Sequence, residues 1–288
     1  MTRISEPETL IIILFVSSAL FARNDEFPVQ FQNHSSAPDV RQIVESSIRA
    51  TERHWKARLQ YTYIERDEDR RLDANGRVKS VAVDVSRTIF IDGVPFEQLV
   101  ERNGRPLSAE AERQQKKKLD LLKRETPQQR AEKLRQEAEE NTSLVREVPK
   151  AFDFQLAGEE VVNGRPAYIL QATPHPGYQP QGKYGKMFAK VEGKLWVDKQ
   201  DLGWIKADGQ VTQSFSIGLF LARVLRGSHI RMEQTRLDNG IWMPEHVSMR
   251  AAAKIFFVKS LVIDRTLTYS EYRPAEASVS TTIAPVIP

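Results

Sequence analysis

The sequence of 288 residues contains no cysteine. This absence excludes disulfide bonds, catalytic thiols, cysteine-bound metal ions and a lipid-modified cysteine behind a signal peptide. Histidine is also scarce. None of the five residues stands in an H-x-x-x-H or H-E-x-x-H pattern, so a zinc site has no local support. The five are His34, His54, His175, His229 and His246.

Motifs of enzyme chemistry are missing too. The chain has no G-x-S-x-G nucleophile elbow and no Walker phosphate loop. Asp67-Glu68-Asp69 is a short carboxylate cluster, but the arginines beside it make it typical of a solvated loop: Arg66, Arg70 and Arg71. We therefore predict a non-enzymatic protein with no catalytic residue, no metal ion and no cofactor.

Long runs of one charge are absent. The 42 basic and 38 acidic residues are mixed along the chain and leave a formal net charge of +4. No basic block is interleaved with aromatic residues, which argues against a nucleic-acid partner.

The strongest apolar run is Leu10–Ala22, LIIILFVSSALFA. A helix of this length spans about 20 Å, whereas the hydrocarbon core of a membrane is about 30 Å thick. The run ends in small residues, with candidate cleavage after Ala19 or Ala22. We predict a signal peptide over 1–22, a flexible leader over 23–37, and a periplasmic or secreted protein. An uncleaved membrane anchor is the alternative.

The stretch Lys186–Val211 shows the pattern of a β-hairpin. Leu195 and Val197 fall on one face of the first strand, and polar residues alternate with them. The turn is Lys199–Gly203, in which the glycine is free to take a positive φ. Across this turn, Ile205 is predicted to share the face of Leu195 and Val197.

Hairpin signals recur along the chain. Asn-Gly and Asp-Gly pairs favour tight turns because both residues tolerate positive φ. They occur at Asn75-Gly76, Asp92-Gly93, Asn103-Gly104, Asn163-Gly164, Asp208-Gly209 and Asn239-Gly240. Alternating runs between them predict an antiparallel meander that closes with strands over Ile230–Leu237, Trp242–Ala253 and Lys254–Tyr272. The dense apolar run Phe215–Leu225 fits either a short helix or a buried strand.

Helices are predicted in two places. Apolar residues at helical spacing, from Val40 to Trp55, indicate an amphipathic helix over Asp39–Lys56, with Ser36 as a candidate cap. The charged segment 108–146 predicts two helices, over 108–124 and 127–143, and Thr126–Gln129 forms a capping box before the second. This insertion is either a solvated helical hairpin or a movable lid. The tail 274–288 is predicted to be disordered.

Three segments carry a resemblance to a known group of proteins. GKLWVDKQDLGWIK (193–206), MEQTRLDNGIWMPEHV (232–247) and LTYSEYR (267–273) resemble the outer-membrane lipoprotein-sorting, LolA/LolB-like superfamily. The similarity is closest to an uncharacterised branch of predicted bacterial secreted proteins. PHPGYQP (174–180) and IDGVPFEQLVERNGRPLS (91–108) are similar to that branch too.

The resemblance implies an α+β fold for residues 38–273: an incomplete antiparallel β-barrel, or highly curved sheet, with helices over its concave face. Proteins of this kind carry acyl chains or act as envelope sensors. The helical insertion is long for a lipoprotein chaperone, which is a departure from that pattern.

The predicted function is therefore a periplasmic carrier or binding protein for a lipid or lipoprotein acyl chain, with an envelope protein as a further candidate partner. The alternative is a structural or sensory envelope protein with a filled core and no lipid ligand. The residues predicted to line an apolar cavity are Tyr61, Tyr63, Leu195, Val197, Ile205, Met249 and Phe257.

Overall fold

One antiparallel sheet organises the part of the chain that the computed structural model describes, residues 39–73, 75–180, 185–217, 222–255 and 259–275. Along the main path, its strands lie in the order β4-β3-β2-β1-β13-β12-β11-β8-β7-β6-β5. The strands are β1 (Tyr61–Leu72), β2 (Val78–Ile91), β3 (Val94–Arg102), β4 (Arg105–Pro106), β5 (Phe152–Val162), β6 (Arg165–Pro174), β7 (Val191–Asp198), β8 (Trp204–Val211), β9 (Phe215–Ile217), β10 (Ala222–Val224), β11 (His229–Arg236), β12 (Trp242–Ile255) and β13 (Lys259–Pro274).

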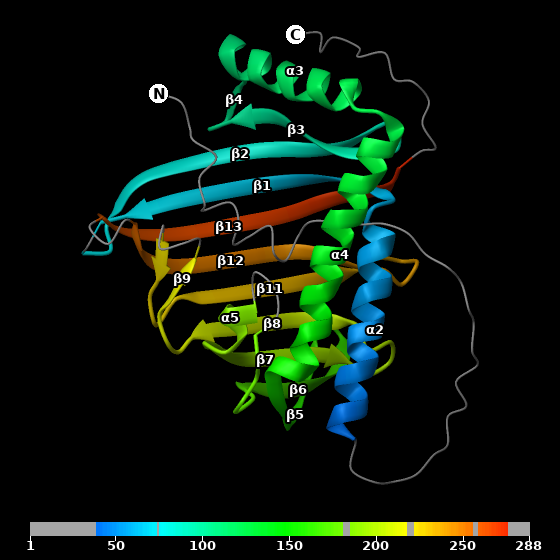
Figure 1. Cartoon of the computed structure of the whole chain (residues 1–288), viewed down its shortest axis with the longest axis vertical. Helices are drawn as coiled ribbons and strands as arrows, with labels where there is room; N and C mark the ends of the chain where they lie inside the picture. The colour runs from blue at the N-terminus through cyan, green and yellow to red at the C-terminus, as the bar shows by residue number, and fades with distance from the viewer. Residues whose placement is uncertain (1–38, 74, 181–184, 218–221, 256–258, 276–288) are drawn as a thin grey trace.

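The sheet is curved and remains open between β4 and β5 (Figure 1). Its first strand, β1, pairs with its last, β13, so the two ends of the meander meet in the middle of the sheet. The short hairpin β9–β10 lies off the main path and is attached through β10 to β12. The predicted α+β class and the incomplete barrel are confirmed.

Most of the predicted hairpin turns form as expected. Asp92-Gly93, Asn103-Gly104 and Asn163-Gly164 have φ values of 50 and 79, 54 and 72, and 50 and 78 degrees. Positive φ at both central residues matches the twist of the flanking strands. Asp208-Gly209 is different, because it lies inside β8 and makes no turn.

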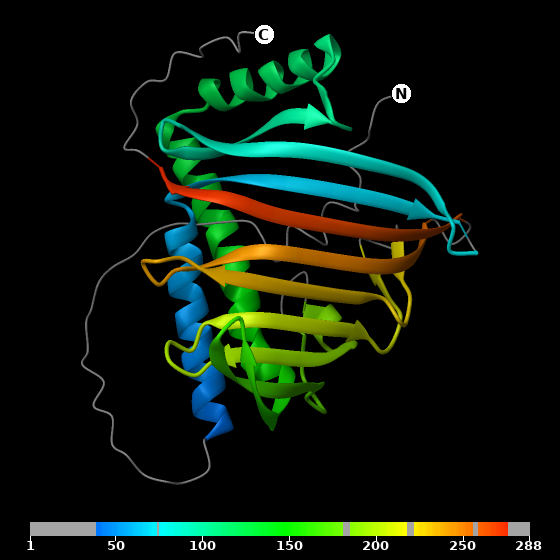
Figure 2. The ribbon, with the colours of Figure 1, turned by 180° about the vertical axis from the view of Figure 1, so that it is seen from behind.

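Two helices, α2 (Val40–Arg58) and α4 (Pro127–Ala151), cross the strands on the concave face. They run beside one another in Figure 1, while the view from behind in Figure 2 shows the other face of the sheet without helices. Arg146 of α4 and Glu52 of α2 form an ion pair of 2.7 Å between them. The cap of α2 is Asp39, whose carboxylate accepts the N–H groups of Arg41 and Gln42; the candidate cap Ser36 lies outside the described residues.

The charged insertion divides into two parts with different roles. Its first helix, α3 (Ala109–Arg124), has no buried residue and lies near β3, where the Gln115 side chain exchanges two hydrogen bonds with the backbone of Leu99. The second, α4, starts with the predicted capping box but continues to Ala151. Because Val145 on α4 is 4% exposed and belongs to the main core, a fully solvated hairpin is the wrong description of 108–146.

The hairpin predicted around Lys186–Val211 also differs in detail. Its first strand begins at Val191, because Gly185–Phe188 forms the short helix α5. The positive φ in the turn, 59 degrees, is at Leu202. Gly203 is needed for space instead: a Cβ there would meet the Trp242 ring at 2.2 Å.

The apolar run Phe215–Leu225 contains the strands β9 and β10, and residues 218–221 between them lie outside the described residues. None of the described helices combines the length and the apolar character needed to cross a membrane.

Candidate functional site

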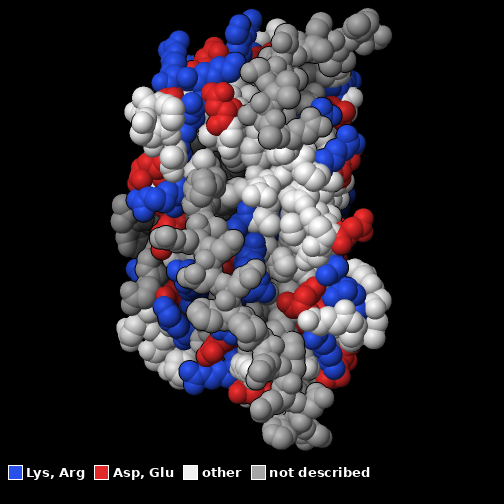
Figure 3. Space-filling view, turned by 90° about the vertical axis from the view of Figure 1, so that its right-hand side faces the viewer, with Lys and Arg blue, Asp and Glu red and all other residues white. Residues whose placement is uncertain are grey.

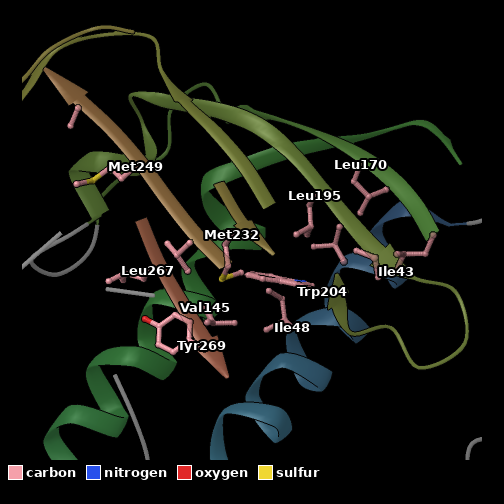
Figure 4. Close-up of a cluster of buried hydrophobic side chains, with 14 residues drawn as sticks. Ile43, Ile48, Val145, Leu170, Leu195, Trp204, Met232, Met249, Leu267 and Tyr269 are labelled. Atoms are coloured by element: carbon pink, nitrogen blue, oxygen red, sulfur yellow. The ribbon is translucent and has the colours of Figure 1, made fainter. Parts of the chain in front are cut away.

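The concave face of the sheet carries the largest apolar cluster, and α2 and α4 cover it. Side chains from both helices and from β6, β7, β8, β11, β12 and β13 meet there (Figure 4). We call this set the concave cluster: Ile43, Val44, Ile48, Val145, Leu170, Leu195, Val197, Trp204, Met232, Val247, Met249, Ala251, Leu267 and Tyr269. It is the candidate site for an apolar ligand.

The opposite, convex face carries a group of charged side chains on the central strands β8 and β11. Arg231 donates two hydrogen bonds to Asp208, at 3.0 and 2.7 Å, and His229 contacts the same carboxylate at 2.6 Å. Figure 3 views the molecule from the right-hand side of Figure 1, between the two faces, and basic and acidic side chains are interspersed there. The larger of the two apolar clusters among the described residues therefore lies on the concave face.

Ile205, a member of the predicted lining, lies on the opposite face from Leu195 and Val197. It belongs to a small separate cluster with Trp196, Ala167 and Trp242, and is 2% exposed there. The pairing of β7 with β8 shifts between Trp196 and Val197, which places Trp204 opposite Val197. A shift of one residue reverses the face of a side chain, so Trp204 takes the inward position predicted for Ile205.

The other predicted lining residues have different surroundings. Leu195, Val197 and Met249 belong to the concave cluster, and Tyr63 packs against it while partly buried. Tyr61 is buried but stands outside the cluster, and its hydroxyl accepts a hydrogen bond from the Asn239 amide. Phe257 lies outside the described residues.

Sequence reasoning missed a row of polar side chains on α2. Ser47, Thr51, His54 and Arg58 are three or four positions apart, so they share one side of the helix. Ser47 is fully buried; its hydroxyl donates to the Val44 carbonyl at 2.8 Å and accepts the indole N–H of Trp204 at 3.1 Å. Thr51 is 3% exposed, and its hydroxyl has no hydrogen-bond partner among the described residues.

His54 is held against the sheet as a neutral imidazole. Its Nδ1 accepts the backbone N–H of Trp242 at 3.4 Å, so the proton of the neutral ring is on Nε2. Burial lowers the pKa of His54 to about 4, and the charge of Arg58 acts in the same direction. Nε2 is buried and has no hydrogen-bond partner among the described residues.

Arg58 ends this row with a guanidinium group that forms no ion pair within the described part of the chain. It donates to the carbonyl of Trp242 at 3.2 Å and to the side-chain oxygen of Gln234. Burial lowers its pKa to about 10, while nearby Tyr272 and Tyr63 oppose that shift. At neutral pH, Arg58 is therefore a cation whose hydrogen-bond partners are the neutral oxygens of Trp242 and Gln234.

A second polar group lies farther along the sheet on β1. Asp67 accepts two hydrogen bonds of 2.7 Å from Arg265 on β13, so the carboxylates at 67–69 belong to a paired strand and not to the predicted loop. Burial, followed by the charges of Glu97 and Asp67, raises the pKa of Glu65 to about 7. In the described part of the chain, no three acidic or histidine side chains are arranged to hold a metal ion.

The chain was compared with family models, curated proteins and solved structures. No family model and no curated protein matches the chain. Similar solved structures include an outer membrane lipoprotein-sorting protein domain from Vibrio parahaemolyticus, at 10% identity and a TM-score of 0.32, covering 82% of this chain and 95% of that one. A LolA-superfamily protein from Nitrosomonas europaea matches at 13% identity and a TM-score of 0.30, covering 82% and 94%.

A third similar structure is the MucA/MucB complex of Pseudomonas aeruginosa, at 12% identity and a TM-score of 0.23, covering 82% of this chain and 100% of that one. The first two structures bear the names of the superfamily that the sequence motifs resemble.

Proposed function

We propose that this protein is a periplasmic, non-enzymatic binding or carrier protein that holds an acyl chain of a lipid or lipoprotein between the sheet and its covering helices. One observation carries the proposal: the concave face is apolar across the strands from β6 to β13, and α2 and α4 cover it as a separate layer. An acyl chain needs an extended apolar surface of this kind, and the charged convex face does not supply one.

The driving force is the transfer of the chain out of water. Burial of each methylene contributes about 0.8 kcal/mol, so a chain of twelve carbons gains roughly 9 kcal/mol before the costs of association. In the structure, side chains of the helices occupy this face (Figure 4). A ligand therefore enters by exchange with α2, α4 or both.

Helix α2 has a physical reason to be displaceable. A buried polar group without a hydrogen-bond partner costs about 1–3 kcal/mol. The hydroxyl of Thr51 and Nε2 of His54 are two such atoms on one helix. Separation of α2 from the sheet removes this penalty, which offsets part of the free energy lost with the apolar burial. A ligand therefore needs to supply less binding free energy to displace α2.

The second candidate is a structural or sensory envelope protein whose core is filled by its own helices. The tight burial of the concave cluster favours it, since the protein's own side chains bury Leu170 and Val197 completely. On this alternative, the concave cluster is ordinary core and no lipid exchanges with it.

Two matched variants separate these functions. Leu195 lies in the concave cluster and Ile205 in the separate cluster on the other face; both are buried. Truncation of either to alanine removes core contacts and costs about 2–5 kcal/mol of stability. We expect Leu195→Ala to alter the affinity for a fluorescent fatty acid, and Ile205→Ala to leave it unchanged, at a temperature at which both variants remain folded.

Equal effects of the two variants on affinity would contradict a ligand on the concave face. No binding by the wild-type protein, together with no lipid extracted from protein purified from a bacterial periplasm, would favour the filled-core alternative. Native mass spectrometry of that preparation provides the second measurement without any probe.

A further inference from the structure

The polar row on α2 carries chemistry that an acyl chain alone does not use. Three of its side chains, Thr51, His54 and Arg58, present hydrogen-bond donors that the described residues leave wholly or partly unused. We propose that these three side chains form a subsite for the anionic head group, a carboxylate or phosphate, of the acyl ligand. The inference rests on the proposed function, because the subsite is reached when α2 separates from the sheet.

The charge of the row matches an anion. Arg58 has no carboxylate partner among the described residues, and two of its hydrogen bonds go to the neutral oxygens of Trp242 and Gln234. A guanidinium group offers five N–H donors, so this group retains capacity for a planar, bidentate anion. Hydrogen bonds to a charged partner are about twice as strong as those between neutral groups.

His54 and Thr51 extend the donor set along the same side of the helix. Because Nδ1 of His54 accepts the N–H of Trp242, its buried Nε2 can act only as a donor. The Thr51 hydroxyl, one turn away, is buried without a partner and is free to donate. Donors without acceptors, next to a cation, suit a carboxylate or phosphate better than an alcohol or an amine.

The position of the polar row relative to the concave cluster predicts how the ligand is oriented. Trp55, which lies between His54 and Arg58 on α2, packs against the concave cluster, as do Tyr63 and Tyr272. The concave cluster and the donors therefore adjoin at the C-terminal half of α2. An amphiphile fits with its chain along the sheet and its head at Arg58.

The test compares ligands that differ only in the head. Laurate and 1-dodecanol are titrated against protein loaded with Nile red, a neutral dye whose displacement reports binding. We expect wild-type protein to bind laurate at least tenfold more tightly than dodecanol. Arg58→Gln should weaken laurate binding by about 10- to 100-fold, the range for a hydrogen bond to a charged group, and leave dodecanol binding unchanged.

Two further variants control this comparison. Arg53→Gln removes an exposed arginine of the same helix and should change neither affinity. Arg58→Lys keeps the cation and should retain a preference for laurate even where Arg58→Gln fails to fold. Acetate and inorganic phosphate alone should not displace the dye, whereas displacement by phosphate alone would identify a free anion, and not a lipid head, as the ligand and overturn the subsite.

The outcomes distinguish this inference from the function on which it rests. Equal affinities of the wild type for laurate and dodecanol overturn the head-group subsite and leave the acyl carrier standing. Equal weakening of both ligands by Arg58→Gln assigns Arg58 a structural role only. Failure of both ligands to displace the dye would contradict both the proposed acyl-carrier function and the head-group subsite.

Discussion

Two hydroxyls one turn apart on α2 should respond to removal with opposite signs. The Thr51 hydroxyl is buried without a partner among the described residues, so Thr51→Val replaces an unsatisfied polar atom with a methyl group of similar size. Relief of that penalty should raise the free energy of unfolding by about 1–2 kcal/mol, since threonine and valine differ little in helix propensity.

Ser47→Ala is the matched comparison. It removes the acceptor of the Trp204 indole N–H and leaves that donor buried. The cost of about 1–3 kcal/mol exceeds the gain of about 0.5 kcal/mol from the better helix propensity of alanine. Ser47→Ala should therefore lower the free energy of unfolding while Thr51→Val raises it.

Urea unfolding followed by circular dichroism measures both changes, with a constant m-value as the check that the unfolded states are comparable. The melting temperature should rise by roughly 2–6 °C for Thr51→Val. A loss of stability in Thr51→Val comparable to that of Ser47→Ala would refute the reasoning, because it would show that the Thr51 hydroxyl is satisfied in the folded protein. Because α2 then packs more stably against the sheet and is harder to displace, the Thr51→Val variant should also bind an acyl chain more weakly.

The remaining predictions concern the hairpin and the polar group on β1. Gly203→Ala places a Cβ at 2.2 Å from the buried Trp242 ring and should lower the free energy of unfolding by about 1–3 kcal/mol, whereas Gly209→Ala, with its closest contact at 3.4 Å, should be nearly neutral in the same urea titration. With its pKa raised to about 7 by burial and then by Glu97, Glu65 holds a proton in the folded protein that the unfolded chain releases near pH 4.5. The stability gained from this proton is complete below pH 4.5 and is lost as the pH rises toward 7. The free energy of unfolding of the wild type should therefore fall over that range, and Glu65→Gln should reduce the fall. An unchanged pH profile in the variant would contradict the raised pKa of Glu65.

Local chemistry was sufficient to predict much of the architecture. Asp92-Gly93 and Asn163-Gly164 form hairpin turns because their φ preferences are properties of the residues themselves. The amphipathic stripe that starts at Val40 and the capping box at Thr126 mark helix positions for the same reason. These signals act over a few residues, and they predicted the strands and the antiparallel meander. The open, curved form of the sheet was implied by the resemblance to a known group of proteins.

Contacts between distant segments decided the candidate site. The shift of pairing between Trp196 and Val197 put Trp204 inside and Ile205 outside, and no local pattern marks a bulge of this kind. Val145 became core only because α4 crosses the sheet beside α2.

The surroundings of the polar row on α2 are also set by distant segments and could not be predicted from local patterns. His54 and Arg58 meet the backbone of Trp242, which is 188 and 184 positions away in the chain. The residue type specifies the hydrogen-bonding capacity of a side chain, but its burial and its partners arise only when separate segments pack together. The sequence by itself therefore determined which donors α2 carries. The tertiary structure alone decided that the Thr51 hydroxyl and Nε2 of His54 are buried between α2 and the sheet without a partner among the described residues.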